Sequence, residues 1–187
     1  MVKYIMTFKG APDARRANAE LLATQIGGNV YEGSRSTVDN LQAILELASK
    51  GFDDLLLLED DVNLCSDFLQ EVDNAVARFP TSVINFNWQK ENIGCFLPFR
   101  IFTELQCVYI PREVVRALLT VLPLFKLKQP NFVSTNDHEK VLQYLKGEFY
   151  AYPYNLVNQN AWKSTILSGY TDKPSKYFKD TLYGTSD

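Results

Sequence analysis

The sequence has few cysteine and histidine residues and no long apolar segment. Its 187 residues include three cysteines and one histidine. The cysteines, Cys65, Cys95 and Cys107, are an odd number without a C-x-x-C pair, which argues against a disulfide framework and a thiolate zinc site. We therefore expect free thiols. No apolar run approaches the ~20 residues of a membrane helix, and the short apolar start is shorter than a signal peptide. These features predict a cytoplasmic protein with no membrane span.

The sequence also lacks an excess of positive charge. It has 19 Lys and Arg against 22 Asp and Glu, a formal net charge of −3. This balance does not favour a protein that grips nucleic acid through its phosphates, although a local basic patch stays open. The turn at residues 9–12 contains neither G-x-G-x-x-G nor G-K-[ST], which excludes a Rossmann fingerprint and a P-loop.

Hydrophobic patterns predict strands and amphipathic helices in alternation along one domain. The first three predicted strands are each followed by a helix, and this rhythm indicates parallel strands joined by crossovers. We thus expect the α/β class, with a mostly parallel central sheet flanked by helices. The predicted strands are residues 2–8, 29–32, 55–58, 83–88 and 103–110, with an edge strand within 149–156. Residues 89–99 contain Gly94 and Pro98 and are predicted to be an irregular loop.

An acidic group follows the most apolar of these strands. Four leucines at 55–58 can be buried on both faces of a sheet, and Glu59, Asp60 and Asp61 come next. Ligands gather at the carboxyl ends of strands in open α/β sheets. If the strand alternation continues, Glu59 and Asp61 point one way and Asp60 the other. Two converging carboxylates suit Mg²⁺ or Mn²⁺, and the alternative is an acidic, solvated turn.

Four segments, in their order along the chain, resemble the GT-A glycosyltransferases, within them the family of lipopolysaccharide-biosynthesis glycosyltransferases and collagen galactosyltransferases. Leu-Leu-Leu-Leu-Glu-Asp-Asp-Val at 55–62 resembles the DxD-type motif, and Cys-Val-Tyr-Ile-Pro-Arg at 107–112 the strand and helix after it. Asn136-Asp137-His138 falls where such enzymes place an acidic residue near the acceptor. The pattern at 152–166 is similar to the one that closes the family's domain. The resemblance implies a GT-A-like domain at 1–167 and a C-terminal tail at 168–187, which could be a lid or a frayed end.

The resemblance implies a metal-dependent glycosyltransferase. It would move a sugar from a nucleotide-sugar donor, with UDP as the expected nucleotide, to an acceptor hydroxyl on a glycan or small glycoside. The implied metal is Mn²⁺ or Mg²⁺, held by Asp61 with Glu59 assisting, and the implied base is Asp137, with Glu139 as a second candidate. The implied donor-binding residues are Phe8, Gly10, Arg16, Glu32, Asp60, Gln159 and Ser164.

Several alternatives stay open at this point. His138 could be a third metal ligand, a base or a structural residue, and Gln159 and Ser164 could simply satisfy backbone groups. Arg15 and Arg16 could both be solvated surface residues. Other candidate functions are a sugar-nucleotide nucleotidyltransferase and a non-catalytic module that binds nucleotide sugars. A hydroxymethylated base in DNA is the less expected acceptor.

Overall fold

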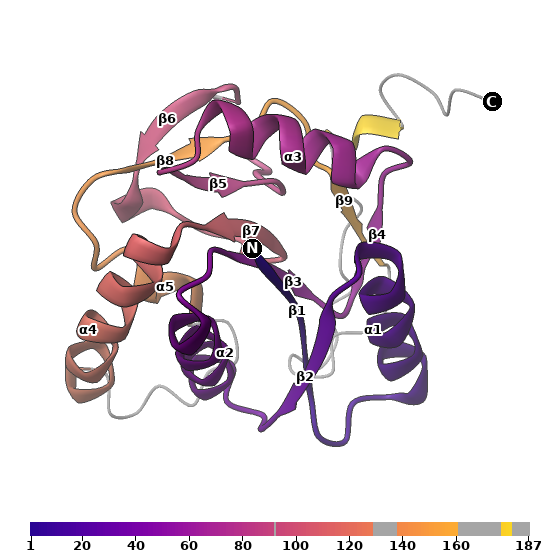
Figure 1. Cartoon of the computed structure of the whole chain (residues 1–187), viewed down its shortest axis with the longest axis horizontal. Coiled ribbons are helices and arrows are strands. Elements are labelled where there is room, and N and C mark those ends of the chain that lie inside the picture. Colours follow the sequence, from indigo (N-terminus) through magenta and orange to yellow (C-terminus); the bar gives the residue numbers. More distant parts are fainter. Residues whose placement is uncertain (92, 129–137, 161–176, 181–187) are drawn as a thin grey trace.

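The computed structural model describes residues 1–91, 93–128, 138–160 and 177–180 (Figure 1). Its helices are α1 (Asp13–Ile26), α2 (Thr37–Gly51), α3 (Phe68–Arg78), α4 (Arg112–Lys128) and α5 (His138–Leu142), with a 3-10 turn η1 (Phe99–Ile101). Its strands are β1 (Val2–Phe8), β2 (Asn29–Gly33), β3 (Leu55–Glu59), β4 (Val62–Leu64), β5 (Val83–Asn85), β6 (Cys95–Pro98), β7 (Cys107–Ile110), β8 (Glu148–Ala151) and β9 (Val157–Gln159).

Local sequence explains where the first helices begin and end. Ser36 caps α2, because its hydroxyl accepts a hydrogen bond from the backbone N–H of Asp39. Gly27 ends α1 in a left-handed conformation with a φ of 62°, which glycine adopts without steric cost. None of the helices in the described part of the chain is both long and apolar enough to cross a membrane.

The main sheet has seven strands in the order β2-β1-β3-β7-β5-β8-β6. The prediction of an α/β fold with helices flanking a central sheet is confirmed, and β1 pairs in parallel with both β2 and β3. The prediction of a mostly parallel sheet is wrong. Strand β7 runs antiparallel to both β3 and β5, and β6 runs antiparallel to β8. The sheet is therefore mixed, because the β-helix-β rhythm of the first three strands does not continue after α3.

Helices cover the sheet on both faces (Figure 1). One core lies between the sheet and α2, α4 and α5, and it includes Leu55 and Leu57 of β3. The other lies between the sheet and α1 and α3, and it includes Leu56 and Leu58. All four leucines are fully buried, as the apolar run predicts for a central strand.

The later part of the chain differs most from the sequence prediction. The segment predicted to be an irregular loop contains β6, which forms the sheet edge by pairing with β8. Strand β8 is consequently an inner strand rather than the predicted edge strand. A separate two-stranded sheet joins β4 to β9, and neither strand has a sequence pattern of its own. These short strands depend on partners that are distant in sequence, which local patterns do not encode.

Candidate active site at the carboxyl ends of the strands

The acidic group lies at the edge of the sheet where the parallel strands β1, β2 and β3 end. Strand β3 ends at Glu59, and Asp60 and Asp61 form a turn that leads directly into β4. Asp60 and Asp61 are 1% and 5% exposed. This low exposure separates them from an ordinary solvated acidic turn, because carboxylates are buried in proteins only when they are paired.

Glu59 lies on the face of the sheet that α5 covers. It continues the alternation of Leu55 and Leu57, and its Oε1 lies 2.8 Å from Nε2 of His138. Burial alone would raise the pKa of Glu59, but the hydrogen bond to His138 and the electrostatic interactions with His138 and Arg15 hold that pKa below its ordinary value. Nδ1 of His138 is buried and has no hydrogen-bond partner among the described residues. The pair thus leaves one imidazole nitrogen available for a proton or a ligand.

Asp60 lies on the opposite face, toward α1. Its carboxylate accepts hydrogen bonds from the hydroxyl of Thr7 and from Arg15, whose Nε lies 2.8 Å from Oδ1. The pKa of Asp60 is nevertheless raised, because burial outweighs the stabilisation by Arg15 and Thr7. Burial would lower the pKa of Arg15, but the charges of Asp61 and Asp60 raise it. Asp60 therefore depends on Arg15 to remain ionised inside the protein.

Asp61 shares Arg15 with Asp60, since its Oδ2 lies 3.2 Å from the guanidinium. The backbone of this turn is also fixed. The side-chain amide of Asn18 donates to the carbonyls of Asp60 and Val62, each at 2.9 Å. The N–H of Asn160 donates to the carbonyl of Asp61 at 2.7 Å. Helix α1 and the end of β9 together hold the acidic turn in one conformation.

The orientation of the carboxylates differs from the sequence expectation. Asp60 and Asp61 both reach the guanidinium of Arg15, whereas Glu59 contacts His138. The alternation of strand side chains stops at Glu59, because the next two residues belong to a turn.

The structure brings some of the other predicted residues near this edge. Phe8 ends β1, and its ring centroid lies 5.8 Å from Cζ of Arg15. Gln159 pairs with Val62 across the β4–β9 sheet. Gly10 forms the turn after β1 with a φ of 83°, and Glu32 is exposed on β2 opposite Thr7.

Three predictions lie outside the described residues. They are Asp137, Ser164 and the side chain of Glu139.

Arg16 does not join the acidic group. Its side chain is 52% exposed and pairs with Asp13 on the same helix, whereas the side chain of Arg15 is 11% exposed and contacts both aspartates. Helical periodicity distinguishes the two arginines only by degree. Arg15 lies four residues before Ala19, on the same helical stripe as the buried Leu22 and Ile26. Arg16 lies at the edge of that stripe, seven residues before the buried Ala23.

A tighter cluster of potential metal ligands lies elsewhere. In the described ranges, Cys65, Asp67 and Asp180 offer ligand atoms within 4.8 Å of one another, whereas no three of Glu59, Asp60, Asp61 and His138 converge to that extent. Burial and the nearby Asp67 raise the pKa of the Cys65 thiol to about 12, so the thiolate that a metal requires is disfavoured.

The two carboxylates of this cluster already have protein partners. Lys179 donates to Asp67, and Ser66 donates to Asp180 from its backbone N–H and its hydroxyl. Lys179 also donates to Glu71 at 3.0 Å. These contacts attach residues 177–180 to the start of α3, which is a structural role.

Comparisons with known proteins relate this chain to others by its fold. No protein-family profile matches the chain, and no curated protein matches its sequence. The solved structure of A197 from STIV superposes with a TM-score of 0.51 and 13% identity, covering 85% of each chain. A glycosyltransferase involved in the glycosylation of the major capsid of PBCV-1 superposes with a TM-score of 0.43 and 11% identity, covering 73% of this chain and 74% of that one. At these identities the likeness to A197 concerns the fold alone.

Proposed function

We propose that this protein transfers a sugar from a nucleotide-sugar donor to an acceptor hydroxyl. The observation that carries the proposal is the buried arrangement of Arg15 with Asp60 and Asp61 at the carboxyl end of β3. It coincides with the segment that resembles the DxD-type motif of GT-A glycosyltransferases. A fixed guanidinium beside carboxylates at this edge of a sheet suits a ligand that carries a diphosphate.

The site offers carboxylates of the kind that bind the divalent cation implied by the resemblance, Mn²⁺ or Mg²⁺, although Asp61 contacts Arg15 and Glu59 contacts His138 in this structure. Carboxylate oxygens of Asp61 and Glu59 are hard donors, whereas Nδ1 of His138 faces away from Glu59, because Nε2 of the same ring contacts that carboxylate. Magnesium commonly binds through one or two carboxylates together with substrate phosphates, so the protein ligands need not form a closed cage. When bound, such a cation supplies charge neutralisation for the leaving nucleoside diphosphate.

The protein's own residues would fix the geometry of the donor. Thr7 donates to Asp60, and Asp60 in turn holds Arg15, so the guanidinium is fixed at the end of β1 without a cost of reorganisation. Asn18 fixes the backbone carbonyls of the acidic turn. Phe8 offers a ring face beside Arg15 to the nucleoside, with Gly10, Glu32 and Gln159 on the same edge.

The acceptor hydroxyl requires a base, and we propose Asp137 on the strength of the family resemblance. His138 then keeps its contact with Glu59 through Nε2 and orients that carboxylate. The acceptor, a glycan or small glycoside, would approach from the same edge of the sheet. A module that binds nucleotide sugars without transferring them would share the donor contacts but would not cleave the donor.

Slow hydrolysis of the donor tests this function without knowledge of the acceptor. We expect the wild-type protein to hydrolyse at least one member of a panel of UDP-sugars in Mn²⁺. Asp61→Asn should lower that rate about a hundredfold, because it removes a proposed ligand while preserving the shape of the side chain.

The matched control is Asp53→Asn. Asp53 lies just before the amino end of β3, and its partly exposed side chain can be replaced without disturbing the fold. Its rate should equal that of the wild type. Equal hydrolysis by Asp61→Asn and the wild type would remove Asp61 from the mechanism.

A further inference from the structure

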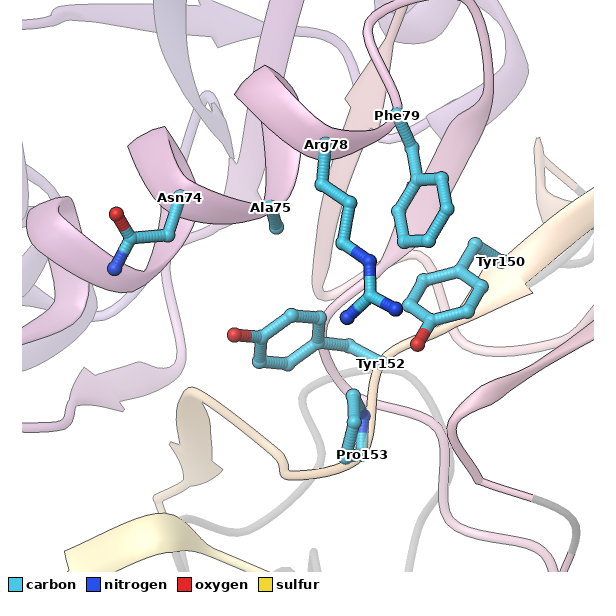
Figure 2. Close-up of a pocket in the computed structure, with 7 residues that line it drawn as sticks. All are labelled: Asn74, Ala75, Arg78, Phe79, Tyr150, Tyr152 and Pro153. Atoms are coloured by element: carbon cyan, nitrogen blue, oxygen red, sulfur yellow. The ribbon is translucent and has the colours of Figure 1, made fainter.

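An aromatic pocket lies between the end of α3 and the end of β8 (Figure 2). Its volume is about 140 Å³. Arg78 and Phe79 come from the end of α3, Tyr150 from β8, and Tyr152 and Pro153 from the segment that follows. No part of the proposed donor site uses these residues.

The aromatic walls of the pocket are held by their neighbours. Phe79 and Tyr150 pack with ring centroids 4.3 Å apart, and Tyr150 is only 6% exposed. The rings of Tyr150 and Tyr152 are nearly perpendicular, with centroids 6.5 Å apart. The hydroxyl of Tyr152 donates a hydrogen bond to Glu71, which fixes this ring. Rings at different angles form a preorganised apolar surface that a ligand does not have to order.

Arg78 places a positive charge at this pocket. Its guanidinium lies 5.1 Å from the centroid of the Phe79 ring, and it makes no hydrogen bond or ion pair with any described residue. Figure 2 shows the guanidinium projecting between the rings of Phe79, Tyr150 and Tyr152. A guanidinium presents five N–H donors in a planar fork, and this fork matches a carboxylate in a bidentate manner.

The pocket and the acidic turn lie on the same side of the molecule. Both Tyr150 and the α1-facing side of β3 belong to the core beneath α1 and α3. Strand β8 runs parallel to β5. Strands β7 and β5 lie between β3 and β8, so the distance from β3 to β8 is three strand spacings, about 14 Å. The chain from Tyr152 to Asn160 connects the pocket to the acidic turn, because the N–H of Asn160 donates to Asp61. An extended oligosaccharide can cover this distance.

We propose that this pocket binds an acidic sugar of the acceptor, with Arg78 pairing with its carboxylate and the ring of Tyr152, supported by the buried ring of Tyr150, packing against its apolar face. The role of this sugar as part of an acceptor rests on the proposed function. Its binding depends on the pocket alone. It narrows the acceptor to a glycan that contains a uronic acid some distance from the reacting hydroxyl.

Calorimetric titration of the full chain with a tetrasaccharide of alternating glucuronic acid and N-acetylglucosamine tests the pocket. The wild-type protein should bind it at least tenfold more tightly than a neutral tetrasaccharide of N-acetylglucosamine. Arg78→Gln should weaken binding of the acidic tetrasaccharide about tenfold, because the charged hydrogen bonds are lost. The substitution is safe for folding, since Arg78 is exposed.

Arg116→Gln is the matched control, because Arg116 is also exposed and lies 5.0 Å from the ring centroid of Phe52 on another surface. It should leave the affinity unchanged. Absence of binding by the wild type, equal affinity for the neutral tetrasaccharide, or an equal effect of the two arginine variants would each overturn the proposal.

A separate titration of the wild type with uridine diphosphate distinguishes failure of the pocket from failure of the donor site. Binding of the acidic tetrasaccharide without binding of uridine diphosphate would support the pocket and count against the proposed transfer. Binding of uridine diphosphate alone would overturn the pocket and leave the donor site standing.

Discussion

Arg15 is the residue on which the acidic turn depends. It is the cation that contacts both Asp60 and Asp61, and its side chain is almost as buried as theirs. A buried carboxylate that loses its partner costs far more than an exposed pair contributes. Replacement of Arg15 should therefore affect stability much more than replacement of Arg16, its neighbour on α1.

Arg15→Gln should lower the free energy of unfolding by about 3 kcal/mol, because it leaves Asp60 buried without its charged partner. Chemical denaturation of the wild type and the variant measures this difference. Arg16→Gln is the control on the same helix and should change stability by no more than about 0.5 kcal/mol. Equal effects of the two substitutions would show that Arg15 is not a buried partner of the aspartates.

At the scale of single residues, the sequence predicts which chemical groups are present better than it predicts which residues they contact. The acidic residues after an apolar strand are visible without a structure, and so is the sole histidine. Neither the contact between His138 and Glu59 nor that between Thr7 and Asp60 follows from sequence, since each joins residues more than 50 positions apart. Arg15 is an intermediate case, because helical periodicity places it on the buried stripe of α1.

At the scale of elements, β3 positions the residues of the site. Its register with β1 places Thr7 beside Asp60, and its alternation directs Glu59 toward α5. Helix α5 has only five residues and is too short to be stable alone, so contacts such as that of His138 with Glu59 attach it to the sheet.

The stability that Glu59 contributes should depend on pH. Its pKa in the folded protein lies below the ordinary value of 4.5, so its contribution is complete above that value and is lost as the pH falls through the lowered pKa. Glu59→Gln should therefore destabilise the protein most at pH 6 to 7. The difference in unfolding free energy between the wild type and the variant should shrink toward pH 3.5, because protonated Glu59 resembles glutamine.

Denaturation curves of both proteins across this pH range provide the measurement. A difference that stays constant with pH would mean that Glu59 gains no stabilisation from its charge in the folded state.

The prediction of elements succeeds where a segment carries its own pattern. Strands β1, β2 and β3 and their helices have strong periodicity and clear end signals, such as Ser36 and Gly27. Strands β4, β6 and β9 have three or four residues each, and their pairing partners decide their structure. Tertiary contacts override weak local propensity in such segments.

At the scale of the whole molecule, the mixed sheet joins two regions of different chemistry. The parallel strands β1, β2 and β3 end at the acidic turn with Arg15, and the later strands carry the aromatic pocket with Arg78. Figure 1 shows α1 and α3 on the side of the sheet that both regions share. Donor binding at the first and acceptor binding at the second would give each half of the sheet a part in one reaction.

Calorimetry with uridine diphosphate tests most directly whether the acidic turn binds the diphosphate of a nucleotide sugar. The wild-type protein should bind uridine diphosphate at least tenfold more tightly in Mn²⁺ than in a metal chelator, and Asp61→Asn should abolish that gain. No binding of uridine diphosphate by the wild type under either condition would contradict the account.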